Sequence, residues 1–225
     1  MSSMPFYLQG VIMQNCNSDR YYTSSKKWWR YDPKWVVLDE VSKPESVLDI
    51  GCSYGDLGVM LKQKGCMVDG VEIYEPAYTE AKKVLNYVYK IDMDHPDLIQ
   101  TEILNSYSLI TLMDVLEHFK DPQSVLSACR RKLSKDGRVI ISLPNVVNIR
   151  ERILFFFGYF DYKEYGVLDK THLHFYTKKT AIALMSSVFL EVRLIECTPR
   201  YDFLKRFVKF WPEMFALQFV IEGKN

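Results

Sequence analysis

The sequence predicts a doubly wound α/β fold, in which helices cover both faces of a largely parallel sheet. Short apolar segments of strand length alternate with helical segments from residue 46 to residue 143, the order expected when right-handed crossovers join parallel strands. An acid also stands at or just after the end of four strand-like segments, at Asp49, Glu72, Asp92 and Asp114. Ligands of such sheets bind beyond the carboxyl ends of the strands, so these acids are expected to share one site.

The first unit is a strand, a glycine turn, a helix and a second strand. Residues 47–50 predict the first strand, residues 57–64 the helix, and residues 67–71 the second strand, which leads into Glu72. Glycines in the turn allow a close approach of backbone to ligand, because they have no Cβ. A carboxylate placed like Glu72 accepts hydrogen bonds from both hydroxyls of a ribose. The unit therefore predicts a nucleoside site.

The other elements follow from the same patterns. Asp121 and Pro122 predict a capped helix start, and residues 107–113 are nearly all apolar, as in a central parallel strand. The remaining predicted helices span residues 33–41, 76–85 and 122 to about 134, and the remaining strands span residues 87–91, 138–143, 190–196 and 215–222.

The glycine turn argues against a nicotinamide dinucleotide. Its fingerprint has glycines at i, i+2 and i+5, and counted from Gly51 those places hold Ser53 and Asp56. An acid in the first helical turn repels a diphosphate. Asp49, just before the turn, instead suits a cationic ligand, so a phosphate-free nucleoside with a positive charge is favoured.

Residues 49–55 resemble the acid-x-Gly-x-Gly-x-Gly motif of the class I methyltransferases that use S-adenosylmethionine (SAM). Asp49, Gly51 and Gly55 match, and Ser53 stands where the middle glycine usually lies. The resemblance implies a seven-stranded Rossmann-like sheet whose last strand is antiparallel. It also implies that Asp49 and the loop hold the methionine amino and carboxylate ends of SAM, while Glu72 holds the ribose.

Further cofactor contacts follow from this resemblance. Asp92 and Met93 are expected to flank the adenine, with the carboxylate reaching its exocyclic amine. Residues 1–45 are expected to be a helical segment that folds over the cofactor, where Tyr22 or Arg30 meets the methionine carboxylate. The other residues expected to line the cofactor are Cys52, Tyr54, Ile73 and Met113.

Two segments narrow the subfamily. Residues 112–118, leading to Asp121 and Pro122, resemble the motif after the fourth strand in small-molecule methyltransferases, including ubiquinone-pathway O-methyltransferases. Residues 166–177 resemble a segment common in methyltransferases encoded among glycan genes. The resemblance implies methyl transfer to a hydroxyl of a small-molecule or glycan acceptor. A phenolic quinone precursor as acceptor, or a SAM-binding regulatory protein without catalysis, are the alternatives.

Methylation of a hydroxyl requires a group that removes its proton, and histidine is suited to this near neutral pH. The catalytic candidates are His118, after the fourth strand, with His172 and His174 and the neighbouring Asp114. In an extended segment His172 and His174 would point to one face, and Asp169 is near enough to orient one of them. The alternative is that these histidines only pack or form structural hydrogen bonds.

A divalent metal is possible but not favoured. Asp114, Glu117 and His118 fall at i, i+3 and i+4 and would converge on a cation if a helix began there. The resemblance to ubiquinone-pathway relatives also implies a metal at such a motif. The favoured alternative is that Asp114 meets only the cofactor and that Glu117 caps the helix, so no metal is expected.

The connection from residue 144 to residue 177 is predicted to be a lid over the acceptor within a methyltransferase domain of residues 46–225, because connections of this length are usually functional. Aromatic rings suit the apolar face of a sugar or a phenol, although some are expected to pack under the sheet instead. The residues expected to contact the acceptor are Tyr159, Tyr162, Tyr165 and Tyr176.

Composition limits the partners. The formal charge of +1 on 225 residues argues against nucleic acid bound by bulk electrostatics. Five scattered cysteines suggest reduced thiols and a cytoplasmic location. Residues 203–211 alternate rings and cations, which is compatible either with peripheral contact to a membrane or, preferably, with a buried amphipathic helix. No oligomeric state is predicted.

Overall fold

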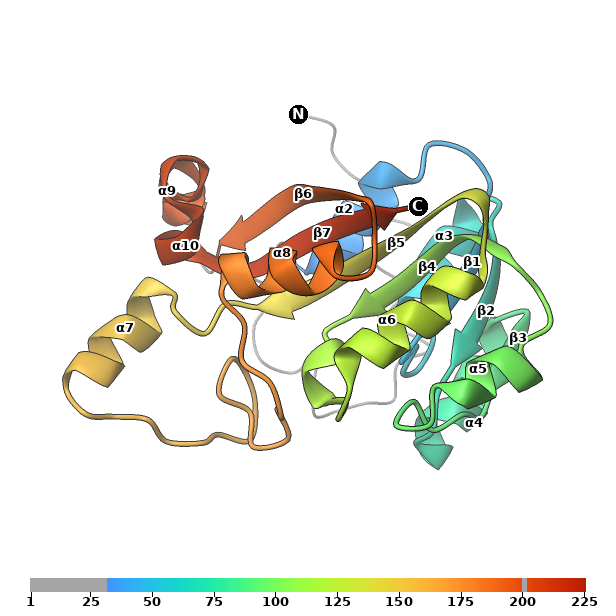
Figure 1. The fold of residues 1–225 in the computed structure, drawn as a ribbon, viewed down its shortest axis with the longest axis horizontal. Helices are drawn as coiled ribbons and strands as arrows, with labels where there is room; N and C mark the ends of the chain where they lie inside the picture. The colour runs from blue at the N-terminus through green and yellow to red at the C-terminus, as the bar shows by residue number, and fades with distance from the viewer. Residues whose placement is uncertain (1–31, 200–201) are drawn as a thin grey trace. The chain divides into compact units, whose positions relative to one another are not determined.

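A seven-stranded mixed sheet runs through the part of the chain that the computed structural model describes, residues 32–199 and 202–225 (Figure 1). Its strand order is β3-β2-β1-β4-β5-β7-β6, and β7 runs antiparallel to both of its neighbours. The predicted doubly wound sheet with an antiparallel last strand is confirmed. The strands are β1 (Ser46–Ile50), β2 (Met67–Val71), β3 (Tyr87–Tyr89), β4 (Tyr107–Met113), β5 (Leu133–Pro144), β6 (Glu191–Pro199) and β7 (Ala216–Lys224).

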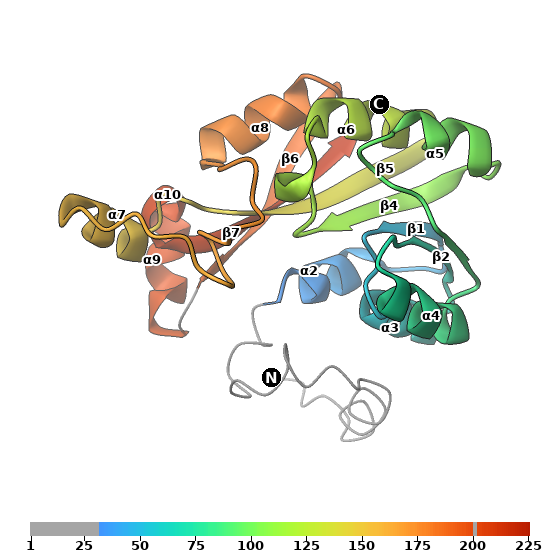
Figure 2. The ribbon, with the colours of Figure 1, turned by 90° about the horizontal axis from the view of Figure 1, so that it is seen from below.

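Helices cover both faces of the sheet. Figure 2 shows α5, α6 and α8 on one side and α2, α3 and α4 on the other. Those six helices are α2 (Pro33–Glu40), α3 (Asp56–Gln63), α4 (Glu75–Val84), α5 (Asp97–Glu102), α6 (Pro122–Arg131) and α8 (Lys178–Ser186). The other helical segments, all beyond the ends of strands, are η2 (Leu116–His118), α7 (Ile149–Phe156), η3 (Asp202–Leu204), α9 (Lys205–Phe210) and α10 (Pro212–Phe215).

The core lies between these layers. Leu48 and Ile50 of β1 and Ile110 and Leu112 of β4 are fully buried. A parallel strand covered on both faces has no solvent side, which is why most residues of these two strands are apolar. The described residues all belong to one compact unit. Among the described residues, no helix combines the length and apolar character needed to cross a membrane.

Several boundaries differ from those predicted. The helix expected to reach about residue 134 ends at Arg131, because Leu133 already pairs with Tyr107 of β4. The ladder shifts register before Arg138 pairs with Leu109. In this shift a Cβ on Gly137 would lie 2.9 Å from the carbonyl oxygen of Tyr107, so the close backbone approach favours glycine there.

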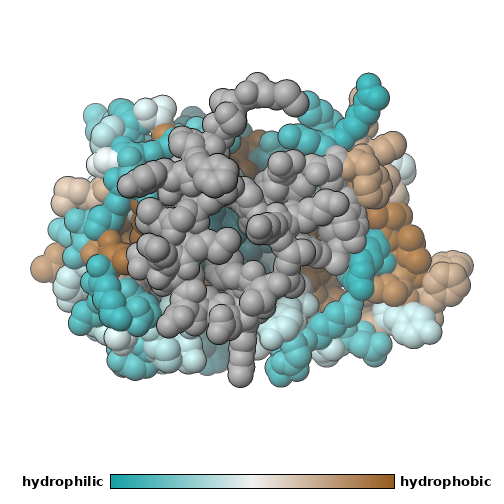
Figure 3. Space-filling view, turned by 180° about the vertical axis from the view of Figure 1, so that it is seen from behind, coloured by the Kyte–Doolittle hydropathy of each residue, from teal (hydrophilic) through white to brown (hydrophobic). Residues whose placement is uncertain are grey.

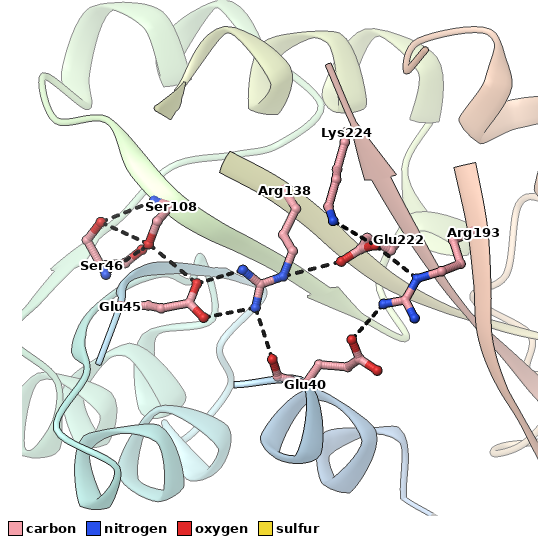
Figure 4. Close-up of polar contacts among 8 residues, drawn as sticks. All are labelled: Glu40, Glu45, Ser46, Ser108, Arg138, Arg193, Glu222 and Lys224. Atoms are coloured by element: carbon pink, nitrogen blue, oxygen red, sulfur yellow. Dashed lines mark hydrogen bonds and ion pairs between the residues drawn. The ribbon is translucent and has the colours of Figure 1, made fainter. Parts of the chain in front are cut away.

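An ion-pair network joins strands and a helix at the amino-terminal edge of the parallel strands (Figure 4). Arg138 of β5 donates to both carboxylate oxygens of Glu45, at 2.8 and 2.9 Å, and its Nε lies 3.3 Å from Glu222 of β7. Arg193 of β6 joins Glu222 at 3.1 Å and Glu40 of α2 at 2.6 Å. The network therefore links α2 to three strands at the edge away from the strand ends that carry the predicted site.

Candidate functional site

The glycine turn after β1 is held in a left-handed backbone. Gly51 and Gly55 have φ values of +68° and +87°, and Ser53 has φ +50°. A non-glycine residue seldom adopts this region, so Ser53 keeps the geometry that explains why glycine usually stands at its place. The amide nitrogens of Gly51 and Cys52 both donate to the carbonyl of Val71, at 2.8 and 3.0 Å, which fastens the turn to the end of β2.

Glu72 accepts hydrogen bonds from backbone amides at the same turn. One carboxylate oxygen accepts from the amide of Ser53 at 2.9 Å and the other from the amide of Tyr74 at 2.7 Å. The side chain is half-buried at the carboxyl end of β2. The carboxylate thus lies beside the turn. A ribose contact at this position is what the sequence predicts.

Asp49 lies beneath the turn and is buried. Its Oδ1 accepts from Thr111 Oγ1 of β4 at 2.7 Å. Burial raises the pKa of Asp49 to about 6, against the opposing effects of the Thr111 hydrogen bond and the charge of Lys34. A cationic ligand would favour the ionised form of Asp49, so binding of such a ligand is expected to be coupled to loss of the Asp49 proton.

Asp114 ends β4 with φ +55°, the second non-glycine residue in a left-handed conformation. Its carboxylate accepts from Ser142 Oγ of β5 at 2.6 Å and from Gln218 Nε2 of β7 at 2.7 Å. Burial raises the pKa of Asp114. Asp92, after β3, accepts instead from the amide of Asp94 at 2.9 Å, a local turn.

Lys34, in the first turn of α2, is a residue that sequence reasoning missed. Its Nζ lies 3.9 Å from carboxylate oxygens of both Asp32 and Asp56, and its charge acts on the ionisation of Asp49 and Asp114. A cation is thus set among the acids at the strand ends. In the sequence, Asp32 followed by proline indicates where the helix begins. It does not indicate where the helix packs, and therefore does not locate Lys34.

Glu117, His118 and His172 come together next to the glycine turn. One ligand atom of each lies within 4.8 Å of the others, and the two imidazole rings pack edge to face with centroids 4.7 Å apart. The glycine turn is adjacent because a Cβ on Gly51 would lie 2.4 Å from Val115 Cγ1, just before η2. Residues 116–118 form a 3₁₀ turn, not the start of an α-helix.

Hydrogen bonds fix the tautomers of both rings. His172 Nδ1 lies 3.2 Å from the carbonyl oxygen of Val167, which can only accept, so this nitrogen carries the proton and Nε2 does not. Thr171 Oγ1 donates to Asp169 at 2.7 Å and lies 3.0 Å from His118 Nδ1. With its own proton committed, Thr171 accepts from His118, whose Nε2 is then a proton acceptor as well. Asp169 therefore orients His118 through Thr171, rather than His172 or His174 as predicted.

Burial disfavours the charged form of both partners in the contact between His172 and Glu117. His172 Nε2 lies 3.9 Å from Glu117 Oε1, yet burial raises the pKa of Glu117 well above its usual value. Burial and the neighbouring His118 lower the pKa of His172. Both shifts oppose the formation of an ion pair. The Glu117 Oε2 atom is buried without a hydrogen-bond partner.

The predicted metal set is only partly brought together. Glu117 and His118 belong to the cluster, but Asp114 faces Ser142 and Gln218 and its place is taken by His172. Two neutral imidazole nitrogens and a carboxylate suit a divalent transition metal, and the unpartnered oxygen of Glu117 fits a ligand.

The predicted acceptor residues divide into two groups. Tyr159, Tyr162 and Tyr165 are each at least 58 % exposed, whereas Tyr176 is 7 % exposed and packs in the core. The contact of each with the acceptor stays a prediction. His174 is turned to the carbonyl oxygen of Lys120, 3.3 Å from its Nε2, and away from the cluster.

A row of aromatic rings leads to the cluster from α7. Ring centroids of Phe155 and Phe160 are 5.2 Å apart, those of Phe160 and Phe175 6.1 Å, and those of Phe175 and His172 6.3 Å. Tyr162 packs against both Phe160 and Phe175, at 6.0 and 6.3 Å. The connection between β5 and α8 thus offers an aromatic wall that ends at the histidine pair.

The other predicted cofactor residues lie as follows. Burial raises the pKa of the Cys52 thiol, Met93 is buried, Tyr54 and Met113 are half-buried, and Ile73 is exposed. Tyr22 and Arg30 lie outside the described residues. Each described member of this set lies on or beside the carboxyl ends of β1 to β4.

Comparisons with known proteins identify the family and agree with the fold. A family model described as a methyltransferase domain matches residues 36–192. The ubiquinone biosynthesis O-methyltransferase of Salmonella paratyphi A is 32 % identical over 147 residues, which cover 56 % of this chain and 59 % of that protein. The enzyme of the same name from Nitrosomonas europaea is 25 % identical over 153 residues, covering 60 % and 65 %. The matches thus span less than two thirds of these curated relatives.

Solved structures share the fold. A SAM-dependent methyltransferase from Archaeoglobus fulgidus superposes with a TM-score of 0.61 at 18 % identity and covers 97 % of this chain and 94 % of its own. Magnesium protoporphyrin IX methyltransferase from Synechocystis, with bound SAM, gives a TM-score of 0.54 at 14 % identity, covering 100 % and 87 %.

Proposed function

We propose that this chain, which belongs to the methyltransferase domain family, is a SAM-dependent O-methyltransferase of a small hydroxyl-bearing acceptor. The observation that carries the proposal is the histidine pair beside the glycine turn, with an unprotonated Nε2 on each ring. A hydroxyl acceptor needs such a proton acceptor, and an acceptor with a free amine needs it less.

The cofactor contacts come from the residues around the turn. Asp49 is suited to the ammonium of the methionine end of SAM, and Glu72 is suited to the ribose. Lys34, whose charge acts on Asp49 and Asp114, is suited to the methionine carboxylate. When bound, SAM supplies an electrophilic methyl group on a sulfonium. A phosphate-free cation fits a site whose central acid is buried with a pKa of about 6.

His118 is the proposed proton acceptor. Its Nε2 takes the hydroxyl proton, and the positive charge that the ring then carries is stabilised through Thr171 by Asp169. Hydrogen bonds from Thr171 outweigh partial burial and lower the pKa of Asp169, so the carboxylate is ionised. His172 stays neutral beside His118 and, with Phe175, forms the wall against which the acceptor is positioned. General-base help of this kind contributes about 10²–10⁴ in rate.

The test separates the base from the fold. His118→Gln is expected to lower kcat by at least about 10², with unchanged affinity for S-adenosylhomocysteine and an unchanged melting temperature. His95→Gln, at an exposed histidine, is the matched control. The measurement is release of S-adenosylhomocysteine with a panel of catechols, simple phenols and nucleotide sugars. Normal turnover by His118→Gln would show that another group takes the proton.

A phenolic acceptor with metal assistance is a second candidate, favoured by the row of rings and by the unpartnered Glu117 Oε2. Glu117, His118 and His172 would hold the metal, which lowers the pKa of a coordinated hydroxyl. The discriminating experiment is Mn²⁺ titration followed by electron paramagnetic resonance, with and without Glu117→Gln. Binding abolished by that variant, together with loss of turnover in chelator, supports this candidate. Turnover of nucleotide sugars without metal supports a glycan acceptor instead.

A further inference from the structure

Exposed apolar side chains gather where α7 meets the segment from η3 to Trp211. We call this the α7–α9 surface. Phe156 and Phe210 are each 85 % exposed, and no member is less than 51 % exposed. Brown side chains gather at the right-hand edge of Figure 3, the side on which α7 and α9 lie. The members are Ile153, Phe156, Phe157, Phe203, Phe207, Phe210 and Trp211.

The spacing of these residues follows the helices that carry them. Ile153, Phe156 and Phe157 fall at i, i+3 and i+4 of α7, and Phe203, Phe207 and Phe210 recur at i, i+4 and i+7 along η3 and α9. Residues so spaced share a helix face. Two neighbouring helical segments therefore each present an apolar face to solvent.

One groove joins the two faces. It has a volume of about 380 Å³ and is lined by Ile153 and Leu154 of α7, Phe203 and Leu204 of η3, and Phe215 of α10. The rings of Phe207 and Phe215 pack with centroids 5.4 Å apart. The groove thus connects the apolar faces of the two segments through Ile153 and Phe203, and large apolar patches on a protein surface mark docking sites.

Cations accompany the rings. Lys205, Arg206 and Lys209 all lie exposed on α9, which carries no acid. In the described part of the chain none of the three forms an ion pair with an acid. Interfacial helices combine apolar side chains with lysine and arginine in this way, because the rings enter the headgroup region while the cations meet lipid phosphates.

We propose that the α7–α9 surface docks on an anionic bilayer. A bilayer fits better than a second copy of this chain, since a symmetric contact would bring the three cations of one copy against those of the other. It also fits better than an ordinary protein partner, because the centres of protein interfaces are depleted of lysine. The mode of attachment is peripheral.

Flotation of the full chain with lipid vesicles tests the proposal without cofactor or acceptor. Vesicles of phosphatidylcholine with about one third phosphatidylglycerol are expected to carry the protein, and vesicles of phosphatidylcholine alone to carry much less. Phe156→Ser combined with Phe210→Ser should lower the partition coefficient by at least about tenfold. Lys209→Glu should lower it by at least about fivefold on the anionic vesicles.

Two control variants replace residues of similar exposure outside the α7–α9 surface. Leu104→Ser, at a residue also 85 % exposed just after α5, and Lys135→Glu, at an exposed lysine at the start of β5, should leave binding unchanged. Absence of vesicle binding, equal binding by the double variant, or a solution dimer that the double variant abolishes would overturn the proposal. Affinity for S-adenosylhomocysteine is expected to be the same in every variant, so failure here leaves the proposed chemistry standing.

Discussion

Asp49 is buried with a pKa near 6, and this predicts that cofactor affinity depends on pH. At pH 5 about one tenth of an acid with this pKa is ionised, and at pH 7 about nine tenths. If the carboxylate holds an ammonium, affinity should therefore rise roughly tenfold from pH 5 to pH 7. S-adenosylhomocysteine carries that ammonium without the sulfonium and is the ligand of choice for calorimetry.

Stability of the unliganded protein should move in the opposite direction. The pKa of Asp49 is raised from 3.8 to about 6, so its contribution is full below pH 3.8 and is lost as pH rises through 6. A shift of about two units corresponds to about 3 kcal/mol. Asp49→Asn lacks this titration, so at pH 8 it should be more stable than the parent by up to about 3 kcal/mol, with no gain near pH 4.

The comparison of parent and Asp49→Asn isolates one group, because other buried acids titrate in both. Asp49→Asn should bind S-adenosylhomocysteine weakly, with no pH dependence between about pH 5 and 7. Asp97→Asn, at an exposed acid, should behave as the parent. A flat affinity profile in the parent, or parent-like binding by Asp49→Asn, would refute the placement of the ammonium at Asp49.

Three other variants test the site and its support. Glu72→Ala should weaken S-adenosylhomocysteine binding at least about tenfold in calorimetry by removing the ribose contact and loosening Ser53; unchanged affinity would remove the ribose from Glu72. Gly51→Ala should destabilise the fold, because φ is +68° and the new Cβ would lie 2.4 Å from Val115 Cγ1; an unchanged melting temperature would contradict that packing. Arg138→Met should cost about 3 kcal/mol in urea unfolding, because the largely buried carboxylate of Glu45 loses its ion-pair partner, while Glu222 keeps Arg193; Lys83→Met, which breaks an exposed pair, should cost less than about 1 kcal/mol.

The sheet could be predicted from sequence because each strand carries a local signal. The strands β1 and β4 are buried and mostly apolar, with Asp49 and Thr111 as their buried polar residues, and each is followed by a left-handed turn at Ser53 or Asp114. Acids at strand ends are found from the strands alone, since the carboxyl ends of parallel strands share one edge. Asp49 and Glu72 were located in this way.

The histidine cluster could be predicted only in part, because it depends on how a long connection folds back. The amides of Leu173 and His174 donate to the carbonyl of Glu117, at 2.8 and 3.2 Å, and these bonds bring His172 to Glu117. No periodic pattern signals such a contact. Tyr176 was assigned to the acceptor for a related reason, since a tyrosine suits a buried wall and a binding wall equally well.

The dependence of His118 on Thr171 and Asp169 has a practical consequence for anyone who redesigns acceptor choice. The loop that carries Tyr162 and Phe175, whose rings pack together, also carries the hydroxyl and the carboxylate that we propose orient His118 as the base. Grafting this loop from a relative would replace the aromatic rings and, in the same step, the Thr171 and Asp169 side chains that orient His118. Hybrids should therefore keep residues 169–172 of the recipient and vary only the rings on either side of them.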